Sequence, residues 1–262
     1  MSDDGTAEVF VVLGARGAED AADRAFLLAA AGWALGTAPG ALSLDRRCPT
    51  CGGTDHGRPS IRPAAREPVN RAAREADAGR RLEVSLSRAG TVVAVALSFA
   101  GPVGIDIEGV AAVSRTDFDD VAFNALEREA LRYARPQNAP LARARMWSAK
   151  EATLKAVGVG LRVDPTELTV LPAAQTGAAS PWGEADLAAS ALTVTWDRRQ
   201  PPDGRLPART PRLVTFDAGP GLVGALAVCG TSAPGGTAAP VVRMVAERNI
   251  RDLARPRPAP AE

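Results

Sequence analysis

Lysine is almost absent from this chain of 262 residues. Only two of the 31 basic residues are lysines, and these two, Lys150 and Lys155, lie five positions apart. A coding bias toward arginine accounts for the other basic residues, but not for two lysines kept so close together. Because lysine carries a compact point charge where arginine carries a planar fork, we expect a geometric reason for their retention.

Other shortages exclude whole classes of protein. Three cysteines are too few for a disulfide framework, and a net charge of +1 argues against a bulk nucleic-acid binder. The longest apolar stretch, residues 91–105, is interrupted by Gly101, Pro102 and Gly104 and is too short to span a bilayer. The N-terminus is acidic where a signal peptide is basic. We therefore expect a soluble, cytoplasmic protein without nucleic-acid or membrane partners.

The hydrophobic pattern alternates between strand and helix periods. Short β-like runs predict strands at 7–13, 82–87, 91–98, 103–108, 167–171, 191–196, 212–216 and 221–228. Helical periodicity predicts helices at 19–36, 117–134 and 140–157. Composition predicts loops at 46–66, 172–190, 197–211 and 230–240, a surface helix or loop at 67–81 and a disordered tail at 253–262. The similar strands at 91–98 and 221–228 leave open two similar α+β halves.

The first motif with chemical content is the predicted strand segment Gly-Ile-Asp-Ile-Glu at residues 104–108. Strand geometry places Asp106 and Glu108 on one face and Ile105 and Ile107 on the other. Two neighbouring carboxylates repel each other unless they share a divalent cation or a buried arginine. The alternative is an exposed strand edge blunted by charge.

The second motif is Trp-Ser-Ala-Lys-Glu-Ala-Thr-Leu-Lys at residues 147–155. On a helix Trp147, Glu151 and Lys155 form one stripe, with Lys150 on its flank. The simple alternative is an ordinary helix with a stabilising Glu-to-Lys pair. Together, the two motifs supply three carboxylates and two ammonium groups, a set that suits Mg²⁺ and a substrate phosphate. Such a set favours chemistry at a pyrophosphate, with one carboxylate taking a proton from an attacking hydroxyl.

The two motifs resemble the signature of the surfactin-type 4′-phosphopantetheinyl transferases. The spacing of 42 residues between Glu108 and Glu151 and the sequence Gly-Val-Gly-Leu at 158–161 belong to the same resemblance. The resemblance extends over roughly residues 20–229. It implies an α+β fold of two similar halves related by a pseudo-twofold axis, with the active site in the cleft between them. On this basis we divide the chain into an N-terminal half (1–101), a C-terminal half with the catalytic motifs (102–230), and a C-terminal extension and disordered tail (231–262).

The family resemblance also implies an activity and roles for individual residues. The family transfers the 4′-phosphopantetheine arm of coenzyme A to a serine of an apo carrier protein and releases adenosine 3′,5′-bisphosphate. Asp106, Glu108 and Glu151 correspond to Mg²⁺ ligands, and Glu151 also to the base that activates the serine. Lys150 and Lys155 correspond to ligands of the coenzyme A phosphates, with Lys155 nearest the pyrophosphate. Trp147 is expected to serve mainly in packing.

Two upstream segments correspond to further parts of the coenzyme A site. In His-Gly-Arg-Pro at 56–59, Arg58 takes the place of the lysine in the family's Gly-Lys-Pro element, and an arginine there can still meet a phosphate. In Glu-Val-Ser-Leu-Ser at 83–87, Ser85 matches a family phosphate contact.

A departure from the family pattern lies beside this serine. Leu86 replaces a histidine that commonly helps to hold the 3′-phosphate. We hypothesise that Arg47, or Arg46 beside it, supplies the missing positive charge.

Several alternatives stay open from the sequence. Cys48 and Cys51 with His56 are an incomplete zinc set, for which free thiols are the simpler explanation. Glu127 is either a helix-surface residue or a partner of the site. The same carboxylates would serve a Mg²⁺-dependent pyrophosphohydrolase of coenzyme A or a related nucleotide, and a non-catalytic carrier-binding homologue is a third possibility. The sequence does not distinguish between carriers of the polyketide, nonribosomal peptide and fatty-acid types. Two halves in one chain favour a monomer.

Overall fold

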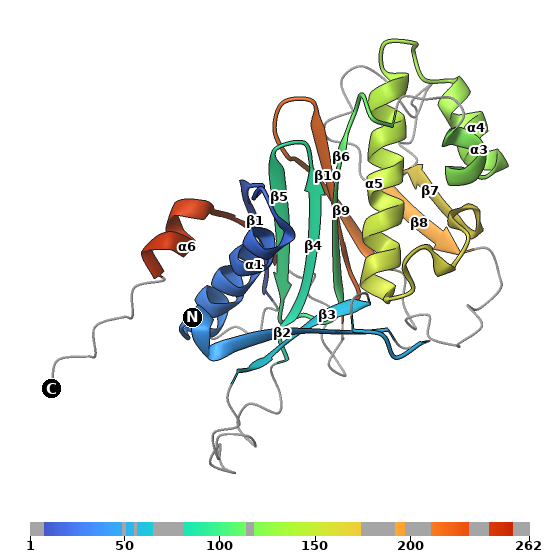
Figure 1. The fold of residues 1–262 in the computed structure, drawn as a ribbon. Helices are drawn as coiled ribbons and strands as arrows, with labels where there is room; N and C mark the ends of the chain where they lie inside the picture. Colours follow the sequence, from blue (N-terminus) through green and yellow to red (C-terminus); the bar gives the residue numbers. More distant parts are fainter. Residues whose placement is uncertain are drawn as a thin grey trace, which may run out of the picture. The chain divides into compact units, whose positions relative to one another are not determined.

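In the computed structural model, the chain is a mixed α+β protein with three sheets among the described residues, which confirms the predicted fold class (Figure 1). The structure describes residues 8–48, 51–54, 57–64, 81–113, 118–173, 192–196, 211–230 and 241–253. These residues form two compact units, which are treated separately below. A twofold relation between halves, and a cleft between them, stay predictions.

The first unit comprises Met1–Leu86, Thr91–Pro102 and Thr231–Glu262. Its six-stranded sheet has the order β11-β1-β5-β4-β3-β2. The strands are β1 (Glu8–Ala15), β2 (Leu42–Arg47), β3 (Arg58–Pro63), β4 (Glu83–Ala89), β5 (Val92–Ser98) and β11 (Val241–Ala246). The helices are α1 (Asp20–Leu35), the 3-10 helix η1 (Pro39–Ala41) and α6 (Glu247–Leu253). Ser87–Gly90, which comprises the end of β4 and the residue after it, groups with the second unit.

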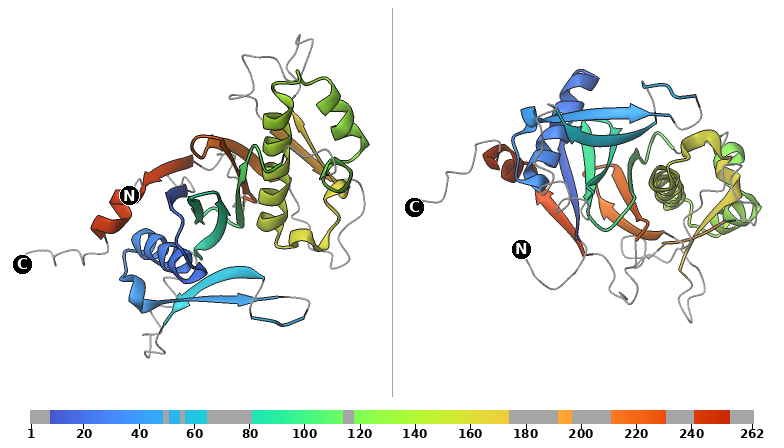
Figure 2. Two further views of the ribbon diagram at one scale, coloured as in Figure 1. Left: turned by 45° about the horizontal axis from the view of Figure 1, so that its top comes forward. Right: turned by 90° about the horizontal axis from the view of Figure 1, so that it is seen from below.

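The core of the first unit forms where α1 and α6 pack beside the sheet (Figure 2). Val12 of β1, Leu27 of α1 and Leu97 of β5 are almost completely buried there. Helix α1 ends, as predicted, at Gly36, whose left-handed φ of 66° lets its N–H reach the last carbonyls of the helix. The C-terminal segment contributes to the same core, because Ile250 of α6 is only 2% exposed.

Three strands of this unit are absent from the sequence-based predictions. The predicted loop 46–66 contains the end of β2 and all of β3, which pair antiparallel from Leu42↔Pro63 to Arg47↔Arg58 (Figure 2). Pro59 and Pro63 conceal β3, because proline is rarely found inside a strand, and the charged run Asp45–Arg47 conceals the end of β2. Strand β11 pairs in parallel with β1, so the C-terminal extension is part of the sheet.

The second unit comprises Ser87–Gly90 and Val103–Gly230. It has a three-stranded sheet of order β6-β10-β9 and a two-stranded sheet of β7 and β8. The strands are β6 (Val103–Gly109), β7 (Leu168–Pro172), β8 (Leu192–Trp196), β9 (Arg212–Asp217) and β10 (Leu222–Val228). The helices are α3 (Asp119–Ala122), α4 (Ala125–Arg132), α5 (Ala139–Val157), η3 (Gly160–Arg162) and η4 (Pro165–Glu167).

Helix α5 lies against β6 and β10 (Figure 1). This is the most extensive packing of a helix on a sheet in the described part of the second unit. The approach is so close at Gly104 that an added Cβ would stand 1.9 Å from the carbonyl oxygen of Ala152. Glycine is therefore required at the start of the Gly-Ile-Asp motif because any side chain would push the helix off the strand. At its C-terminal end α5 is closed by Gly158, which has a left-handed φ of 82°.

The predicted helix 117–134 is two helices, and the reason is a helix cap. Asn124 has extended backbone angles, and its side chain accepts a hydrogen bond from the N–H of Glu127 at 3.1 Å. The Glu127 carboxylate in turn accepts from the N–H of Asn124 at 2.8 Å. This reciprocal capping box starts α4 and separates it from α3.

Several predicted segments lie largely or wholly outside the described residues. They are the surface segment 67–81, the loops 172–190, 197–211 and 230–240, and the tail 253–262. None of the helices in the described part of the chain is long and apolar enough to cross a membrane.

Candidate active site

The two carboxylates of β6 face helix α5. Gly104, two positions before Asp106, meets the backbone of that helix, and the period of two directs Asp106 and Glu108 to the same side. Ser148 of α5 donates a hydrogen bond to the carbonyl of Asp106 at 2.9 Å and so fixes the strand against the helix. Asp106 is 3% exposed, whereas Glu108, nearer the end of the strand, is half-buried.

Asp106 uses its two carboxylate oxygens differently. Its Oδ1 accepts hydrogen bonds from Lys155 Nζ at 2.6 Å and from Ser87 Oγ at 2.8 Å. Its Oδ2 is buried and has no hydrogen-bond partner among the described residues. Burial raises the pKa of Asp106 above its usual value, and Lys155 and Ser87 offset part of that rise. A buried carboxylate oxygen without a partner is costly, so this oxygen marks a place where a ligand would fit.

Glu108 is held by the tryptophan of the helical motif. Trp147 Nε1 donates a hydrogen bond to Glu108 Oε1 at 3.1 Å, and the indole packs edge-to-face on Phe118 with ring centroids 4.8 Å apart. The pKa of Glu108 is raised to about 7 by burial and by the negative charge of Asp106. Trp147 therefore orients a carboxylate in addition to the packing role that the sequence predicts.

Glu151 and Lys155 lie one turn apart on α5, on the stripe that starts at Trp147. Burial raises the pKa of Glu151, and the charge of Asp106 raises it further, while Lys155 lowers it. The Lys155 side chain is 29% exposed and also approaches Ser87 Oγ at 3.4 Å and the carbonyl of Ile105 at 3.3 Å. The site thus combines three electrostatically coupled acids with one accessible ammonium group.

The donor chemistry of this cluster fits a magnesium ion. Asp106, Glu108 and Glu151 offer hard oxygen donors, and Asp106 Oδ2 has no hydrogen-bond partner among the residues that the structure describes. Within the part of the chain that the structure describes, no three His, Cys, Asp or Glu side chains already stand together closely enough to hold a metal ion. The three carboxylates are therefore near one another but not drawn together into a coordination sphere.

Lys150 does not lie with Lys155. Its ammonium is completely buried beside Glu127, with 2.5 Å between Nζ and Oε2. It also donates to the carbonyls of Ala122 at 2.7 Å and Pro165 at 2.8 Å, so all three N–H groups have acceptors. This arrangement disagrees with the expectation that Lys150 binds coenzyme A phosphates, because no donor is left for a phosphate.

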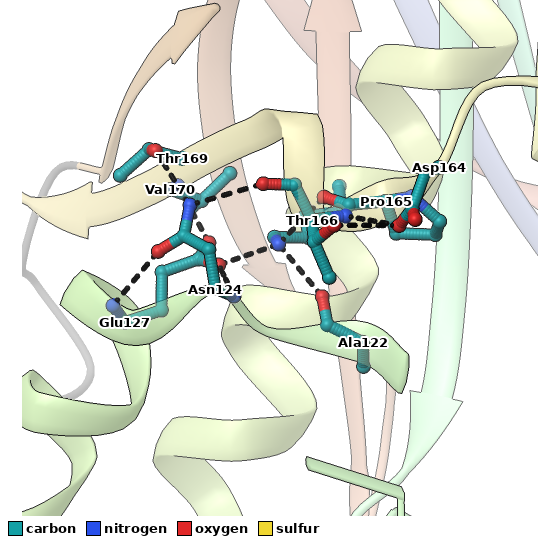
Figure 3. Close-up of polar contacts among 9 residues, drawn as sticks. Ala122, Asn124, Glu127, Asp164, Pro165, Thr166, Thr169 and Val170 are labelled. Atoms are coloured by element: carbon teal, nitrogen blue, oxygen red, sulfur yellow. Dashed lines mark hydrogen bonds and ion pairs between the residues drawn. The ribbon is translucent and has the colours of Figure 1, made fainter. Parts of the chain in front are cut away.

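Glu127 is the centre of the network around Lys150. Besides the lysine and the cap, its Oε1 accepts a hydrogen bond from the N–H of Val170 in β7 at 2.8 Å (Figure 3). Asn124 extends the network by donating to Thr169 Oγ1 at 2.7 Å. Of the two alternatives for Glu127, the helix-surface residue is therefore excluded, since the side chain is 0% exposed.

The remaining predicted phosphate ligands lie in the first unit. Arg47 and Arg58 are direct cross-strand partners in β2 and β3 and hence project to the same face of the sheet. Arg58 Nη2 forms an ion pair with Glu83 Oε2 at 3.2 Å. Ser85 of β4 is 5% exposed. Because two adjacent guanidinium groups repel each other, an anion between them would be favourable.

Two backbone hydrogen bonds connect Cys48, directly after β2, with Gly52 and Gly53. Cys48 donates its N–H to the carbonyl of Gly53 at 2.8 Å and accepts at its own carbonyl from the N–H of Gly52 at 2.9 Å. Cys48 is buried and Cys51 is exposed, and neither forms a disulfide. His56, the third member of the zinc set, lies outside the described residues.

Ser87 is the site residue that the sequence analysis does not single out. It is 7% exposed and bonds to the carboxylate of Asp106. The available signal is its spacing of two from Ser85, which places both hydroxyls on one face of a strand. Nothing local in the sequence indicates that Asp106 lies opposite it.

The segment that carries most of these groups also matches a known family. A search of curated proteins finds no match for the chain. The sequence model of the 4′-phosphopantetheinyl transferase superfamily matches residues 102–199, a range that includes β6 and the whole of α5. The match confirms the resemblance expected from the two motifs. Residues 102–199, with Asp106, Glu108, Glu151 and Lys155 among them, are therefore similar to the 4′-phosphopantetheinyl transferase superfamily.

Proposed function

We propose that this chain transfers the 4′-phosphopantetheine group of coenzyme A to a serine hydroxyl of an apo acyl or peptidyl carrier protein, giving holo carrier protein and adenosine 3′,5′-bisphosphate. The main support is the cluster on β6 and α5, in which Lys155 Nζ lies 2.6 Å from Asp106 Oδ1 and the other, buried oxygen of Asp106 has no partner in the described part of the chain. The superfamily of residues 102–199 supports the same class of transfer.

Glu151 is the proposed general base. Its pKa is raised by burial and by Asp106, and a carboxylate whose pKa lies closer to neutral accepts a proton more readily at working pH. The carrier serine gives its proton to Glu151 while its oxygen forms a bond to the β-phosphorus of coenzyme A. The bond from that phosphorus to the bridging oxygen breaks, and the electron pair leaves with adenosine 3′,5′-bisphosphate.

Lys155 is the proposed stabiliser of the charge on the leaving phosphate. Only one of its three contacts is shorter than 3 Å, so its ammonium keeps donor capacity for a phosphate oxygen. Asp106, Glu108 and Glu151 would hold the magnesium ion. Bound there, the ion would neutralise the pyrophosphate oxygens.

Arg47, Arg58 and Ser85 are proposed to bind the coenzyme A phosphates. The support is the cross-strand pairing of the two arginines, whose charges an anion would balance. Carriers of polyketide, nonribosomal peptide or fatty-acid synthases are the proposed partners, which would place the protein in secondary metabolite or fatty-acid biosynthesis. We propose that it acts as a cytoplasmic monomer.

The function is tested by incubating the purified chain with coenzyme A and a panel of apo carriers, with and without Mg²⁺, and weighing the carriers by mass spectrometry. We expect a Mg²⁺-dependent mass increase of one phosphopantetheine on at least one carrier. Glu151→Gln should abolish the increase, whereas Glu129→Gln on the exposed face of α4 should leave it unchanged.

Other products would identify the other candidates. Free phosphopantetheine without modified carrier would indicate a pyrophosphohydrolase. Carrier binding without any turnover would indicate a non-catalytic homologue. Undiminished transfer by Glu151→Gln would remove Glu151 from the base role.

A further inference from the structure

We propose that Ser87 is a positioning residue of the site: its hydroxyl, together with Lys155, occupies Oδ1 of Asp106 and thereby reserves Oδ2 for the metal ion. The inference rests on the proposed function, since it concerns the Mg²⁺ that the transfer would use. It adds a residue that lies outside the matched segment 102–199.

Oδ1 of Asp106 already has two hydrogen-bond donors. A carboxylate oxygen accepts about two hydrogen bonds through its lone pairs. Oδ1 already receives two, from Ser87 Oγ at 2.8 Å and from Lys155 Nζ at 2.6 Å. Both lone pairs of this oxygen are used, so Asp106 can bind a further ligand only through Oδ2.

The state of Oδ2 carries the second step. Oδ2 is buried and has no hydrogen-bond partner among the described residues, and Asp106 as a whole is only 3% exposed. A buried acceptor without a donor destabilises the protein, and a bound cation would offset this free-energy cost. The carboxylate is therefore held through Oδ1, by Ser87 of β4 and Lys155 of α5, while Oδ2 keeps its capacity for a further ligand.

Ser87 and Lys155 make different contributions to this orientation. Lys155 is 29% exposed and is the proposed phosphate ligand, so its ammonium is shared between Asp106 and the substrate. Ser87 is 7% exposed, and its single hydroxyl proton is already donated to Asp106. When Lys155 turns toward a phosphate, Ser87 is the donor that keeps Oδ1 occupied. Hydrogen-bond partners of metal-binding carboxylates commonly have this orienting effect.

The test is the affinity of the full-length protein for Mg²⁺, measured by titration calorimetry with MgCl₂ in the presence and absence of coenzyme A. Ser87→Ala should weaken binding about 10- to 100-fold, as loss of such a partner typically does. Ser87→Thr keeps the hydroxyl and should retain affinity close to that of the unaltered protein. Thr153→Val is the matched control: it removes a buried hydroxyl of α5 that donates to the carbonyl of Ala149 at 2.8 Å, within the helix itself.

Unchanged Mg²⁺ affinity in Ser87→Ala would overturn the proposal, as would equal weakening in Thr153→Val. Absence of Mg²⁺ binding by the unaltered protein under both conditions would also overturn it. If Ser87→Ala does not fold, Ser87→Cys replaces it, because a thiol is a weak donor and should reproduce the loss. Carrier modification, assayed on the same samples, reports separately on the proposed transfer, so that either proposal can fail alone.

Discussion

At the residue scale, Lys155 shows why an arginine-rich chain retains a lysine. Its ammonium fits among three oxygens, of Asp106, Ser87 and Ile105, all within 3.4 Å. A single nitrogen can stand at the centre of such a set, whereas a guanidinium spreads its donors over a plane. The charge of arginine would be equivalent here, but its shape would not.

The first prediction follows from this geometry. Lys155→Arg should reduce the rate of carrier modification by at least about tenfold, because the planar fork cannot make the same contacts to Asp106 while binding phosphate. The measurement is the rate of mass increase of the carrier. Arg132→Lys on α4, where the side chain is 76% exposed, should leave that rate unchanged. A fully active Lys155→Arg would show that only charge is required.

Glu108 provides a prediction for the pH dependence of stability. Its pKa is raised from 4.5 to about 7 by burial, by Asp106 and by Glu151, against the opposing effects of Trp147 and Lys155. Between these two pH values the folded protein holds a proton that the unfolded chain has released. Stability falls as pH rises wherever the folded state binds more protons, so the metal-free protein should become less stable from about pH 5 to pH 7.

Denaturation in the presence of a chelator across this pH range measures the effect. Glu108→Gln should flatten the decline, because a neutral amide has no proton to hold. Glu129→Gln, which alters a carboxylate that is 50% exposed, should preserve it. A decline of equal steepness in Glu108→Gln would assign the effect to other groups.

At the element scale, the ion pair of Glu127 and Lys150 connects parts of the second unit that are distant in sequence. Lys150 belongs to α5, Glu127 to α4, and their further contacts reach Ala122 of α3, Pro165 of η4 and Val170 of β7 (Figure 3). The flank of the catalytic helix is thereby fixed, while the stripe with Glu151 and Lys155 stays directed at β6. Lys150 thus supports the site without belonging to it.

The third prediction concerns this buried pair. Glu127→Gln should lower the free energy of unfolding by about 3–5 kcal/mol, because it leaves the Lys150 ammonium buried without a counter-charge. The double variant Glu127→Gln with Lys150→Met should recover part of that loss, since neither charge then remains buried. Urea denaturation provides the measurement.

An exposed pair on α4 is the matched control for the buried one. Glu129 and Arg132 lie 2.8 Å apart with side chains that are 50% and 76% exposed. Glu129→Gln should cost less than about 1 kcal/mol. Similar losses from the buried and the exposed pair would contradict the role assigned to Glu127.

Local patterns explain how much of the fold could be predicted from the sequence. The strands predicted at 103–108 and 221–228 agree with β6 and β10 within one residue, because an alternating or small-residue run is visible without its partners. Strand β11 is missed, since only its pairing with β1 makes it a strand. The break between α3 and α4 is missed although the capping pattern was present in the sequence.

In the candidate site, too, local patterns could be predicted from the sequence and tertiary contacts could not. The common face of Asp106 and Glu108 follows from strand period, which two residues are enough to reveal. The surroundings of Lys150 could not be predicted, because helical spacing places it on a flank but does not say that Glu127, 23 residues earlier, packs there. The bond from Ser87 to Asp106, 19 residues later, depends on tertiary structure in the same way.

At the scale of the whole molecule, the first unit is assembled from three separate parts of the chain, of which Thr231–Glu262 is the last. Strand β11 covers the edge of β1 along six residue pairs, from Glu8↔Val241 to Leu13↔Ala246. An ion pair between Arg243 and Glu8 at 2.9 Å adds to the pairing. The C-terminal segment is therefore part of the first unit and not an appendage.

The fourth prediction tests this integration. Ile250→Ala should weaken the first unit by about 2–5 kcal/mol, because Ile250 is 2% exposed and its removal leaves a cavity in the core. Met244→Ala, at a side chain of β11 that is 54% exposed, should change stability by less than about 0.5 kcal/mol. Hydrogen exchange of the β1 amides reports the difference, and equal protection in both variants would contradict it.

The position of β11 in the chain has a consequence for protein synthesis. The ribosome synthesises β1 before the second unit and its parallel neighbour β11 only after that unit. Throughout that interval β1 has an open edge to which the strand of another nascent chain could pair. The unit that is begun first is thus completed last, and its folding yield during translation should depend on how quickly the final segment follows.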